Sequence, residues 1–370
     1  MKKVILITGH YWLSKRKAGF HWLANAFWEL GWEVTFLTVA ISYLSLLKKD
    51  YRFQYPIFKE ANQLIEIKPN FYSYVYFTPW HPANLRLDVL NHLSEELFTH
   101  YSHFINSVLD HKIRESDLFI FESTPGIILF DYFLSLNQKA RLIYRVSDDL
   151  AFLKNHPLVL KKEAECASQF DLVSVPSEFL YQKFKDYSNC CLHYHGIPKS
   201  LFQVPYQSPY QNPDQINAIF VGNSYLDYDF LSWASQLFPN WYFHIIGNFQ
   251  NLSDYNYDNV ITYGEMPFSE TIPYLVHADL GLQTLFQGYS PGIESFTDSL
   301  KVIQYTYCQL PIVAPSYLPS SREHFFYYHP RDPTTIKNAL LKASCYPRDK
   351  INTQGIYSWE ELALKLLERI

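Results

Sequence analysis

One lysine stands out by its position in the chain. No other Lys or Arg occurs in the long stretch from 200 to 300, and Lys301 is followed by the apolar-periodic run Val302 to Tyr305. The residues before it, Thr, Asp and Ser at 297 to 299, are types that begin helices, so the spacing predicts a helix start at Lys301. A helix start offers free N–H groups and a positive dipole to a phosphate. The alternative is a lysine that extends from a helix edge into solvent.

Polar residues also follow three apolar runs in the first half of the chain. They are His10, Glu122 and the run from Arg145 to Asp149, which includes Asp148. A carboxylate at a strand end can take a proton from a hydroxyl within hydrogen-bond reach, and Asp148 is our candidate for this base. The alternative for Asp148 is a helix cap, but Asp149 directly precedes the helical run and suits that role better. His10 is either a second polar contact or an alternative base.

A different set of residues follows the predicted strands of the second half. Gly222 and Gly247 allow a ligand to approach the backbone closely, although a glycine after a strand is also a common turn residue. Glu265 can accept hydrogen bonds from a ribose diol, or it can be an exposed loop acid. With a diphosphate near Lys301, these residues would form a nucleotide-sugar site.

Composition sets limits on the class of protein. The chain has 370 residues, of which 48% are hydrophobic, and this predicts about two globular domains. Its formal net charge of −5 argues against nucleic acid as a partner, because binding to a phosphate backbone needs a basic surface. The five cysteines lack metal-ligand spacing and fit a reducing cytoplasm. The first apolar run is too short for a signal peptide, and no run is long enough to span a membrane.

The order of the apolar runs predicts two α/β halves, each a doubly wound sheet of the nucleotide-binding type, facing each other across a cleft. We expect a first domain over 1–204, a proline-rich linker over 205–214 and a second domain over 215–357. An amphipathic helix over 358–370 is expected to pack back toward the first domain. The predicted strands are 4–8, 32–39, 117–122, 141–145, 172–175, 218–222, 242–247, 260–263, 280–282 and 311–314.

Several segments, in the same order along the chain, resemble glycosyltransferase family 70, the GumK-type bacterial β-glucuronosyltransferases of xanthan assembly. The resemblance covers nearly the whole chain, and the loop from His10 to His21 shares it in His10, Arg16, Ala18 and His21. The other matching segments are 115–117, 121–123, Tyr144-Arg-Val-Ser-Asp148, Phe243-His-Ile-Ile-Gly247, Asn259-Val-Ile-Thr-Tyr-Gly-Glu-Met266 and Lys301-Val-Ile-Gln-Tyr305.

This resemblance implies a GT-B fold of two Rossmann-like domains and an inverting transfer from a UDP-sugar, most simply UDP-glucuronic acid. The implied acceptor is a polyprenyl-diphosphate-linked oligosaccharide of exopolysaccharide or capsule assembly, at the inner face of the cell membrane. Carried over by position, the catalytic base is Asp148. The implied donor contacts are Glu265, Lys301, Gln304 and the positions now occupied by Ser224 and Leu285, with Gly222 beside them. His10, Arg16 and Glu122 are candidates on the acceptor side.

Two departures from the family pattern keep another donor open. Ser224 stands where the family has Met, and Leu285 stands where it has a donor-contacting Tyr. A GT-B enzyme that uses a different UDP-sugar, such as a neutral hexose, is therefore the main alternative. A non-catalytic sugar-nucleotide-binding protein is the third reading, and the presence of a base beside a phosphate site argues against it. No Asp-x-Asp motif occurs, so the sequence does not require a metal or another cofactor.

The N-terminal region interleaves cations with large aromatic residues, a combination that favours a membrane surface. The first group comprises Trp12, Lys15, Arg16, Lys17, Phe20 and Trp22, and a second run extends from Tyr43 to Lys49. We expect peripheral attachment to the membrane through these residues. The alternatives are that Phe20 and Trp22 belong to the core and that Arg16 binds a phosphate of the acceptor.

Overall fold

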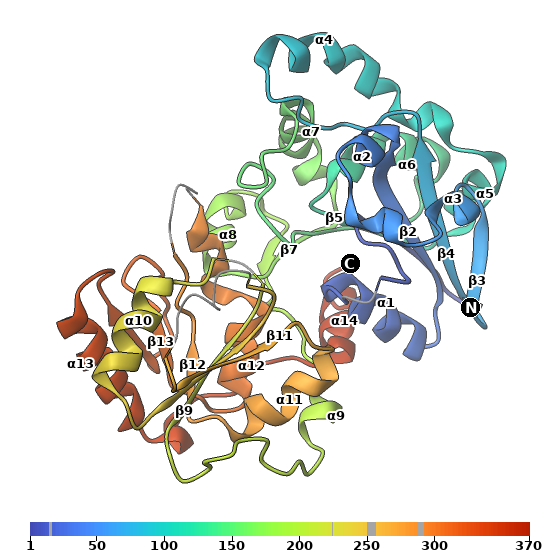
Figure 1. Cartoon of the computed structure of the whole chain (residues 1–370). Helices are drawn as coiled ribbons and strands as arrows, with labels where there is room; N and C mark the ends of the chain where they lie inside the picture. The colour runs from blue at the N-terminus through green and yellow to red at the C-terminus, as the bar shows by residue number, and fades with distance from the viewer. Residues whose placement is uncertain (15–16, 224, 250–256, 287–291) are drawn as a thin grey trace. The chain divides into compact units, whose positions relative to one another are not determined.

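The computed structural model describes residues 1–14, 17–223, 225–249, 257–286 and 292–370 (Figure 1). The chain forms two compact units. The first comprises Met1–His193 together with Trp359–Ile370, and the second comprises Tyr194–Ser358. Each unit is a sheet covered by helices on both faces, and each is described by itself below.

The sheet of the first unit has eight strands in the order β3-β4-β2-β1-β5-β6-β7-β8. All neighbours pair in parallel except β3 and β4, which are antiparallel. The chain order reverses between β1 and β5, which is where a doubly wound sheet opens a crevice for ligands. The strands are β1 (Lys3–Thr8), β2 (Glu33–Ser42), β3 (Leu64–Lys68), β4 (Phe71–Thr78), β5 (Leu118–Glu122), β6 (Arg141–Arg145), β7 (Leu172–Val175) and β8 (Cys190–Leu192).

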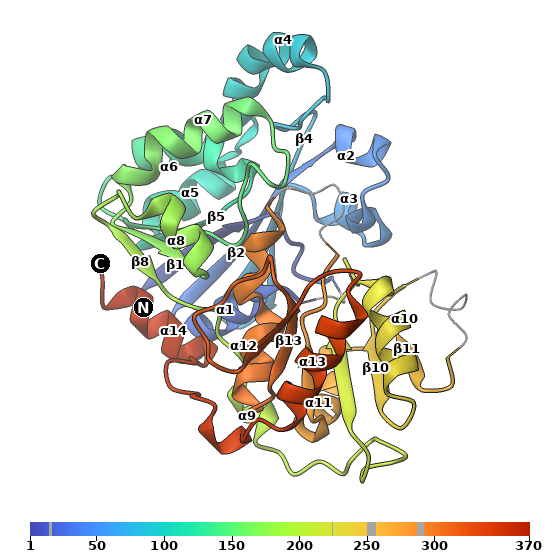
Figure 2. The ribbon, with the colours of Figure 1, turned by 90° about the vertical axis from the view of Figure 1, so that its left-hand side faces the viewer.

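Side chains alternate between the two faces of this sheet. Ile5 and Ile7 of β1 pack with apolar residues of α5, α6, α7 and α8, whereas α1 contacts β1 and β2 and is joined by α14. Figures 1 and 2 show α14 beside α1. The helices are α1 (Gly19–Glu29), α2 (Tyr43–Leu47), α3 (Ile57–Glu60), α4 (Asp88–Thr99), α5 (Ser107–Glu115), α6 (Phe130–Leu136), α7 (Pro157–Cys166), α8 (Glu178–Phe184) and α14 (Trp359–Leu367).

The second unit has a six-stranded, fully parallel sheet in the order β11-β10-β9-β12-β13-β14. This is the 3-2-1-4-5-6 order of a dinucleotide-binding fold, and its order reverses between β9 and β12. The strands are β9 (Asn217–Val221), β10 (Tyr242–Ile246), β11 (Val260–Gly264), β12 (Leu280–Leu282), β13 (Ile312–Pro315) and β14 (Phe325–Tyr328).

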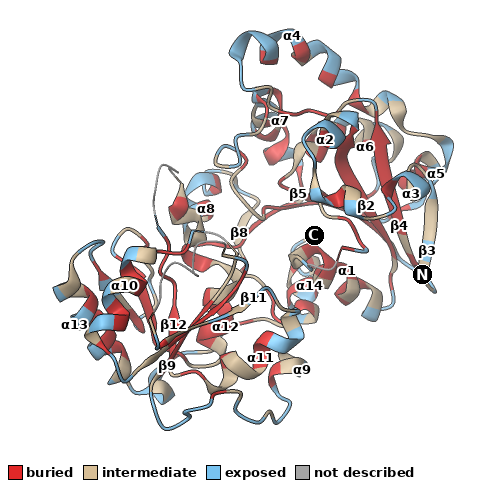
Figure 3. Cartoon of the chain, viewed as in Figure 1, coloured by how far each residue is buried: buried red, intermediate tan, exposed pale blue. Residues whose placement is uncertain are grey.

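Alternation along β9 separates the two cores of this unit. Ala218 and Phe220 pack with α10 and α13, whereas Ile219 packs with α9, α11 and α12. The buried strands are red at the centre of the unit in Figure 3. The helices are α9 (Lys199–Phe202), α10 (Tyr228–Leu237), α11 (Phe268–His277), α12 (Leu300–Tyr307) and α13 (Pro333–Ser344), and the 3₁₀ turn η6 (Ile293–Asp298) precedes α12.

The predicted boundary at 204 and the predicted linker over 205–214 are wrong. The structure divides the chain after His193, and the segment from Tyr194 onward belongs to the second unit. This proline-rich segment is not an extended linker, because apolar residues within and before it pack against the second unit. Ile197 and Tyr210 are buried in the core of the second unit, and the hydroxyl of Tyr210 donates to the carbonyl of Tyr274 over 2.6 Å.

The fold class is confirmed. Each predicted strand has its ends within three residues of those of an observed one, and the C-terminal helix is α14 of the first unit. The sequence analysis missed β3, β4, β8 and β14. The sequence of β4, Phe71-Tyr-Ser-Tyr-Val-Tyr-Phe-Thr78, is buried on both faces apart from Tyr72, and its alternating aromatics do not show a single hydrophobic face.

Candidate active site

The first group of candidate residues lies near the point where the strand order of the first unit's sheet reverses. His10 follows β1, Glu122 ends β5, and Asp148 follows β6. The carboxyl ends of these neighbouring parallel strands meet at one edge, so the fold brings together three residues that are far apart in sequence.

Glu122 is the buried centre of this group. Its side chain accepts hydrogen bonds from the hydroxyl of Thr8, from Gly9 N at 3.3 Å and from Ser147 Oγ at 2.9 Å. Its Oε1 lies 3.5 Å from His10 Nε2. Burial disfavours the carboxylate, but His10 and these hydroxyl groups outweigh it and hold the pKa of Glu122 below its ordinary value. Because its lone pairs are occupied inside the protein, Glu122 is poorly placed to take a proton from a substrate.

His10, unlike Glu122, is partly open to solvent. Its side chain remains 35% exposed and contacts Glu122 from the solvent side. Burial disfavours the imidazolium, yet the Glu122 carboxylate overrides burial and raises the pKa of His10. His10 is therefore a cationic or hydrogen-bonding contact near neutrality rather than a free base.

Asp148 is the one carboxylate of the group that no described residue engages. Its backbone N–H donates to Ser123 Oγ over 3.0 Å, as does that of Ser147, which fixes the turn after β6. Its carboxylate makes no hydrogen bond or ion pair within the described ranges. Burial, with the Glu122 charge adding to it and His10 opposing it, raises the pKa of Asp148 to about 6. A carboxylate held in this way is suited to act as a base near neutral pH.

The segment after Asp149 forms turns, and the next helix, α7, begins at Pro157, so the helix start predicted after Asp149 is wrong. Asp149 stabilises this turn instead. Its Oδ1 accepts from Ala151 N and from Lys183 Nζ, both over 2.9 Å. Asp149 therefore has a structural role, whereas the carboxylate of the adjacent Asp148 is unengaged.

The second group of candidates lies at the corresponding edge of the second unit. Lys301 is the second residue of α12, whose N-cap Ser299 makes no side-chain capping bond. Its Nζ lies 4.0 Å from the centre of the Phe220 ring, and within the described part of the chain Lys301 makes no ion pair or side-chain hydrogen bond. Burial lowers the pKa of Lys301 to about 7. An anion at this place would restore the charge of the lysine.

The strand ends around Lys301 leave open backbone. A Cβ added to Gly222 would lie 3.3 Å from Lys301 Nζ, and one added to Gly247 would lie only 1.8 Å from the Gly222 carbonyl oxygen. Only glycine fits at 247, because any side chain there would collide with this carbonyl. The two glycines therefore keep the neighbouring ends of β9 and β10 close together beside the lysine.

Two other predicted donor contacts, Glu265 and Gln304, lie near this edge of the sheet. Glu265 is exposed, whereas Gln304 is buried. Glu265 follows β11, and its Oε1 accepts from Asn223 Nδ2 over 2.9 Å. Asn223 Oδ1 in turn accepts from Asn248 N over 2.9 Å, so it connects three strand ends. Gln304 lies one turn after Lys301 and is 4% exposed, and its amide makes no hydrogen bond to a described residue.

The structure does not support a donor contact by the side chain of Leu285. It is 2% exposed and packs in the core with α10 and α13, because an apolar side chain at this position is better accommodated in the interior than at a polar site. Its carbonyl accepts from the hydroxyl of Tyr317. Ser224 and Arg16 lie outside the described residues.

Two residues of the candidate sites were missed by the sequence analysis. Neither Asn223 nor Gln283 was singled out. Gln283 Nε2 donates to the carbonyl of Phe296 over 2.8 Å and to Ser299 Oγ over 3.2 Å, so it holds the start of α12. Its position directly after β12 was the available signal, since strand-end residues face the crevice in such sheets.

Comparison with known proteins agrees with this arrangement. Over 100% of the chain and 98% of the other protein, the structure resembles sucrose-phosphate synthase from Thermosynechococcus elongatus, with a TM-score of 0.68 and 14% sequence identity. An α,α-trehalose-phosphate synthase from Burkholderia xenovorans matches with a TM-score of 0.58 and 9% identity, over 100% of both chains. The fold is the GT-B fold of glycosyltransferases.

Sequence comparison defines the relationship more narrowly. Residues 6–176 match the family model for the N-terminal domain of the glucuronosyltransferase GumK. The chain is also 27% identical over 365 residues to the UDP-glucuronate:glycolipid 2-beta-glucuronosyltransferase of Xanthomonas campestris pv. campestris, covering 98% of this chain and 89% of the relative. The chain is therefore similar to GumK-type glucuronosyltransferases, as its sequence motifs indicated.

Proposed function

We propose that the protein transfers glucuronic acid, with inversion, from UDP-glucuronic acid to a polyprenyl-diphosphate-linked oligosaccharide in exopolysaccharide or capsule assembly. The observation that carries this proposal is the unengaged carboxylate of Asp148, with its raised pKa, in a chain similar to a UDP-glucuronate:glycolipid glucuronosyltransferase. A protein that only bound sugar nucleotides would have no use for such a base.

In the proposed reaction, Asp148 accepts the proton of an acceptor hydroxyl while that oxygen attacks the anomeric carbon of the donor. The bond from this carbon to the diphosphate breaks on the opposite face, so the configuration inverts. Glu122 holds His10, and His10 orients the acceptor or one of its anionic groups. Ser123 fixes the backbone of Asp148 through its hydroxyl.

The leaving UDP gains negative charge as this bond breaks. We assign its stabilisation to Lys301 and the free N–H groups at the start of α12, because charge-assisted contacts gain strength as charge develops. Gln304 would contact the diphosphate from the next turn, and Glu265 would accept from the ribose diol. No metal or organic cofactor is needed in this scheme.

A different UDP-sugar, such as a neutral hexose, is the second candidate donor. It is favoured by Leu285, whose buried side chain cannot supply the contact that a tyrosine would make at this position. The test is a transfer assay with a panel of UDP-sugars, read together with thermal shifts of the wild-type protein. Selective turnover of UDP-glucuronic acid supports the first donor, and faster turnover of UDP-glucose would replace it.

We further propose that the first unit attaches peripherally to the cytoplasmic face of the membrane, through residues that differ in part from those predicted. Trp12 and Phe20 are buried in the core, and Lys17 donates to the carbonyl of Trp12 over 2.5 Å. Lys15 and Arg16 lie outside the described residues. Within the described residues, no helix has the length and apolar character needed to cross a bilayer. The second predicted run remains available, because Leu47 is 80% exposed beside Lys48 and Lys49.

Helix α4 adds an apolar surface to this region. It buries Asn91, Ser94 and Phe98, whereas its leucines are exposed, although an ordinary surface helix buries most of its apolar residues. The helix is mostly pale blue in Figure 3. Its exposed apolar residues are Leu87 at its N-cap, Val89, Leu90, Leu93 and Leu97.

Hydrogen bonds connect the second predicted run to the loop that follows the candidate base. Lys48 Nζ donates to the carbonyl of Asn84 over 3.5 Å, and Asn84 Nδ2 donates to the carbonyl of Lys154 over 3.0 Å, in the loop that follows Asp148. Leucines beside lysines suit an anionic lipid surface, and this place would present a lipid-linked acceptor to Asp148.

Flotation with anionic liposomes tests the membrane surface. The wild type should float, and a variant carrying Leu90→Ser and Leu93→Ser should float far less. Leu341→Ser, which removes an exposed leucine from the second unit, is the matched control and should float normally. Equal flotation of all three proteins would exclude α4 as the attachment surface.

A further inference from the structure

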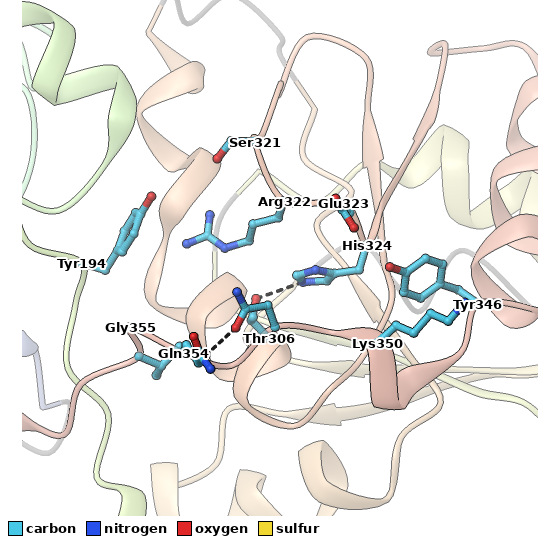
Figure 4. A pocket seen from close by; sticks show the side chains of 12 residues that line it. Tyr194, Thr306, Ser321, Arg322, Glu323, His324, Tyr346, Lys350, Gln354 and Gly355 are labelled. Carbon is cyan, nitrogen blue, oxygen red and sulfur yellow. Dashed lines mark hydrogen bonds between the residues drawn. The ribbon is translucent and has the colours of Figure 1, made fainter.

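The second unit contains a pocket that shares no lining residue with the proposed donor site. Its volume is about 370 Å³, which is within the usual range for small-molecule sites. Figure 4 shows that its side chains come from the segment before β14, from the end of α13 and from the segment that leads to α14. The argument below uses Tyr194, Arg322, Tyr346, Lys350, Asn352 and Gln354.

Arg322 has hydrogen-bonding capacity left over in this pocket. Its Nη1 pairs with the buried carboxylate of Asp298, and its guanidinium lies 4.7 Å from the centre of the Tyr194 ring. In the described part of the chain, no oxygen accepts from its Nε or Nη2 groups. Asp298 and Tyr194 therefore fix the planar group while one edge of its donors is left unused. An arginine held in this way can bind the oxygens of a phosphate with two parallel hydrogen bonds.

A second cation lines the same pocket. Lys350 is exposed and makes no ion pair with a described residue. Glu323 is the one acid of the lining, against these two cations. His324 adds no charge near neutrality, because burial, aided by the nearby Arg322 charge, lowers the pKa of His324 to about 4. Because Asp298 already pairs with Arg322, the attraction for an anion comes from the unused donors of Arg322 and from Lys350 rather than from a net positive charge.

The remaining lining groups suit a polar, hydroxyl-rich molecule. Asn352 Oδ1 accepts from Gln354 N over 2.8 Å, and the side-chain NH₂ of Asn352 and the side-chain amide of Gln354 make no hydrogen bond to a described residue. Amides can both donate and accept, and Tyr346 adds an aromatic ring with a hydroxyl group. This combination, a fixed cation beside amides and aromatic rings, is more than an inorganic ion needs.

We propose that this pocket is a second ligand site, separate from that of the donor, and that it binds a phosphate monoester of a small sugar. The phosphate contacts the free edge of Arg322 and Lys350, and the sugar contacts the two amides and Tyr346. This proposal goes beyond the transfer reaction and does not depend on it.

Calorimetry of the full-length wild-type protein tests the proposal, with glucose 6-phosphate as the probe and glucose as its uncharged control. Saturating UDP is present throughout, so that a phosphate cannot report binding near Lys301. We expect glucose 6-phosphate to bind under these conditions and glucose not to bind.

Two variants locate the binding. Arg322→Lys keeps a cation near Asp298 but removes the planar fork, and Lys350→Met removes an exposed charge without disturbing the core. Each should weaken glucose 6-phosphate by about tenfold or more. Lys337→Met, an exposed lysine of α13 outside the lining, should bind like the wild type.

Three results would each overturn the proposal. They are the absence of binding in the presence of UDP, equal binding of glucose, and wild-type affinity in both pocket variants. Thermal melting of Arg322→Lys shows whether a loss of binding comes from unfolding. If Arg322→Lys is unstable, Lys350→Met still decides the test. UDP binding, measured separately, distinguishes failure of this site from failure of the donor site.

Discussion

The two strand-end sites differ in how their charges are satisfied. In the first unit, Glu122 and His10 satisfy each other and leave Asp148 as the unengaged carboxylate. In the second unit, Lys301 lies at a helix start with no described anion beside it. Burial moves the pKa of Asp148 up to about 6 and that of Lys301 down to about 7. The same physical cause thus prepares one site to accept a proton and the other to receive negative charge.

The largest expected effect comes from removing the base. Asp148→Asn keeps the shape of the side chain but loses its basic oxygen, so turnover should fall by about 10² to 10⁴. Affinity for UDP, measured by calorimetry, should stay within about twofold, because the two sites have separate tasks. The matched control is Asp149→Asn, which weakens a turn contact and removes an ion pair and should retain most of its turnover. Near wild-type turnover of Asp148→Asn would make His10 the candidate base.

The second largest effect is expected from the removal of Lys301 in the second unit. Lys301→Ala should weaken UDP by about tenfold or more while changing uridine little, since a charge-assisted contact to phosphate is lost. Lys337→Ala removes an exposed lysine of the same unit and serves as the control. Equal weakening of UDP and uridine would mean that Lys301 does not contact the diphosphate.

Proton uptake sharpens the same point. The lowered pKa of Lys301, about 7, means that most of the free protein carries an uncharged lysine at pH 8. A bound diphosphate favours the charged form, so UDP binding at pH 8 should take up a proton, and less so at pH 6. Calorimetry in buffers of different ionisation enthalpy measures this uptake. Lys301→Met should abolish it, and uptake that persisted in this variant would belong to another group.

The smallest effect is expected at the ribose contact. Glu265 is exposed, so Glu265→Ala should weaken UDP and uridine by the same factor, between about twofold and tenfold. Comparison of the two ligands is the measurement. A selective loss for UDP would move Glu265 to the diphosphate, and this would contradict the assignment of that region to Lys301.

The sequence predicted the central strands well because they are continuous apolar runs, whose burial on both faces leaves little ambiguity. It also predicted a strand-end position for Asp148 and a helix-start position for Lys301, since both follow from local patterns. The position of Leu285 was misjudged, because family correspondence does not report which way a replaced side chain turns. The linker was misjudged because proline content does not show that Tyr210 is buried between its prolines.

Contacts between distant segments could not be predicted. The four groups around Glu122 come from the ends of β1 and β6, and nothing local in the sequence indicates that they converge on one carboxylate. The hydrogen bond from Gln283 to Ser299 likewise depends on a segment that returns to the sheet. Such contacts decide the pKa values, so the electrostatic difference between the two sites became visible only in the structure.

The most direct test of the account is the pH dependence of the single-turnover transfer rate, measured with saturating UDP-glucuronic acid and limiting acceptor. Because Asp148 must be deprotonated to act as the base, the account predicts that the rate falls as the pH drops through about 6, the raised pKa of this carboxyl group. A rate that stays constant from pH 8 down to about 5 would contradict the account, since an essential base with this pKa would already be mostly protonated there.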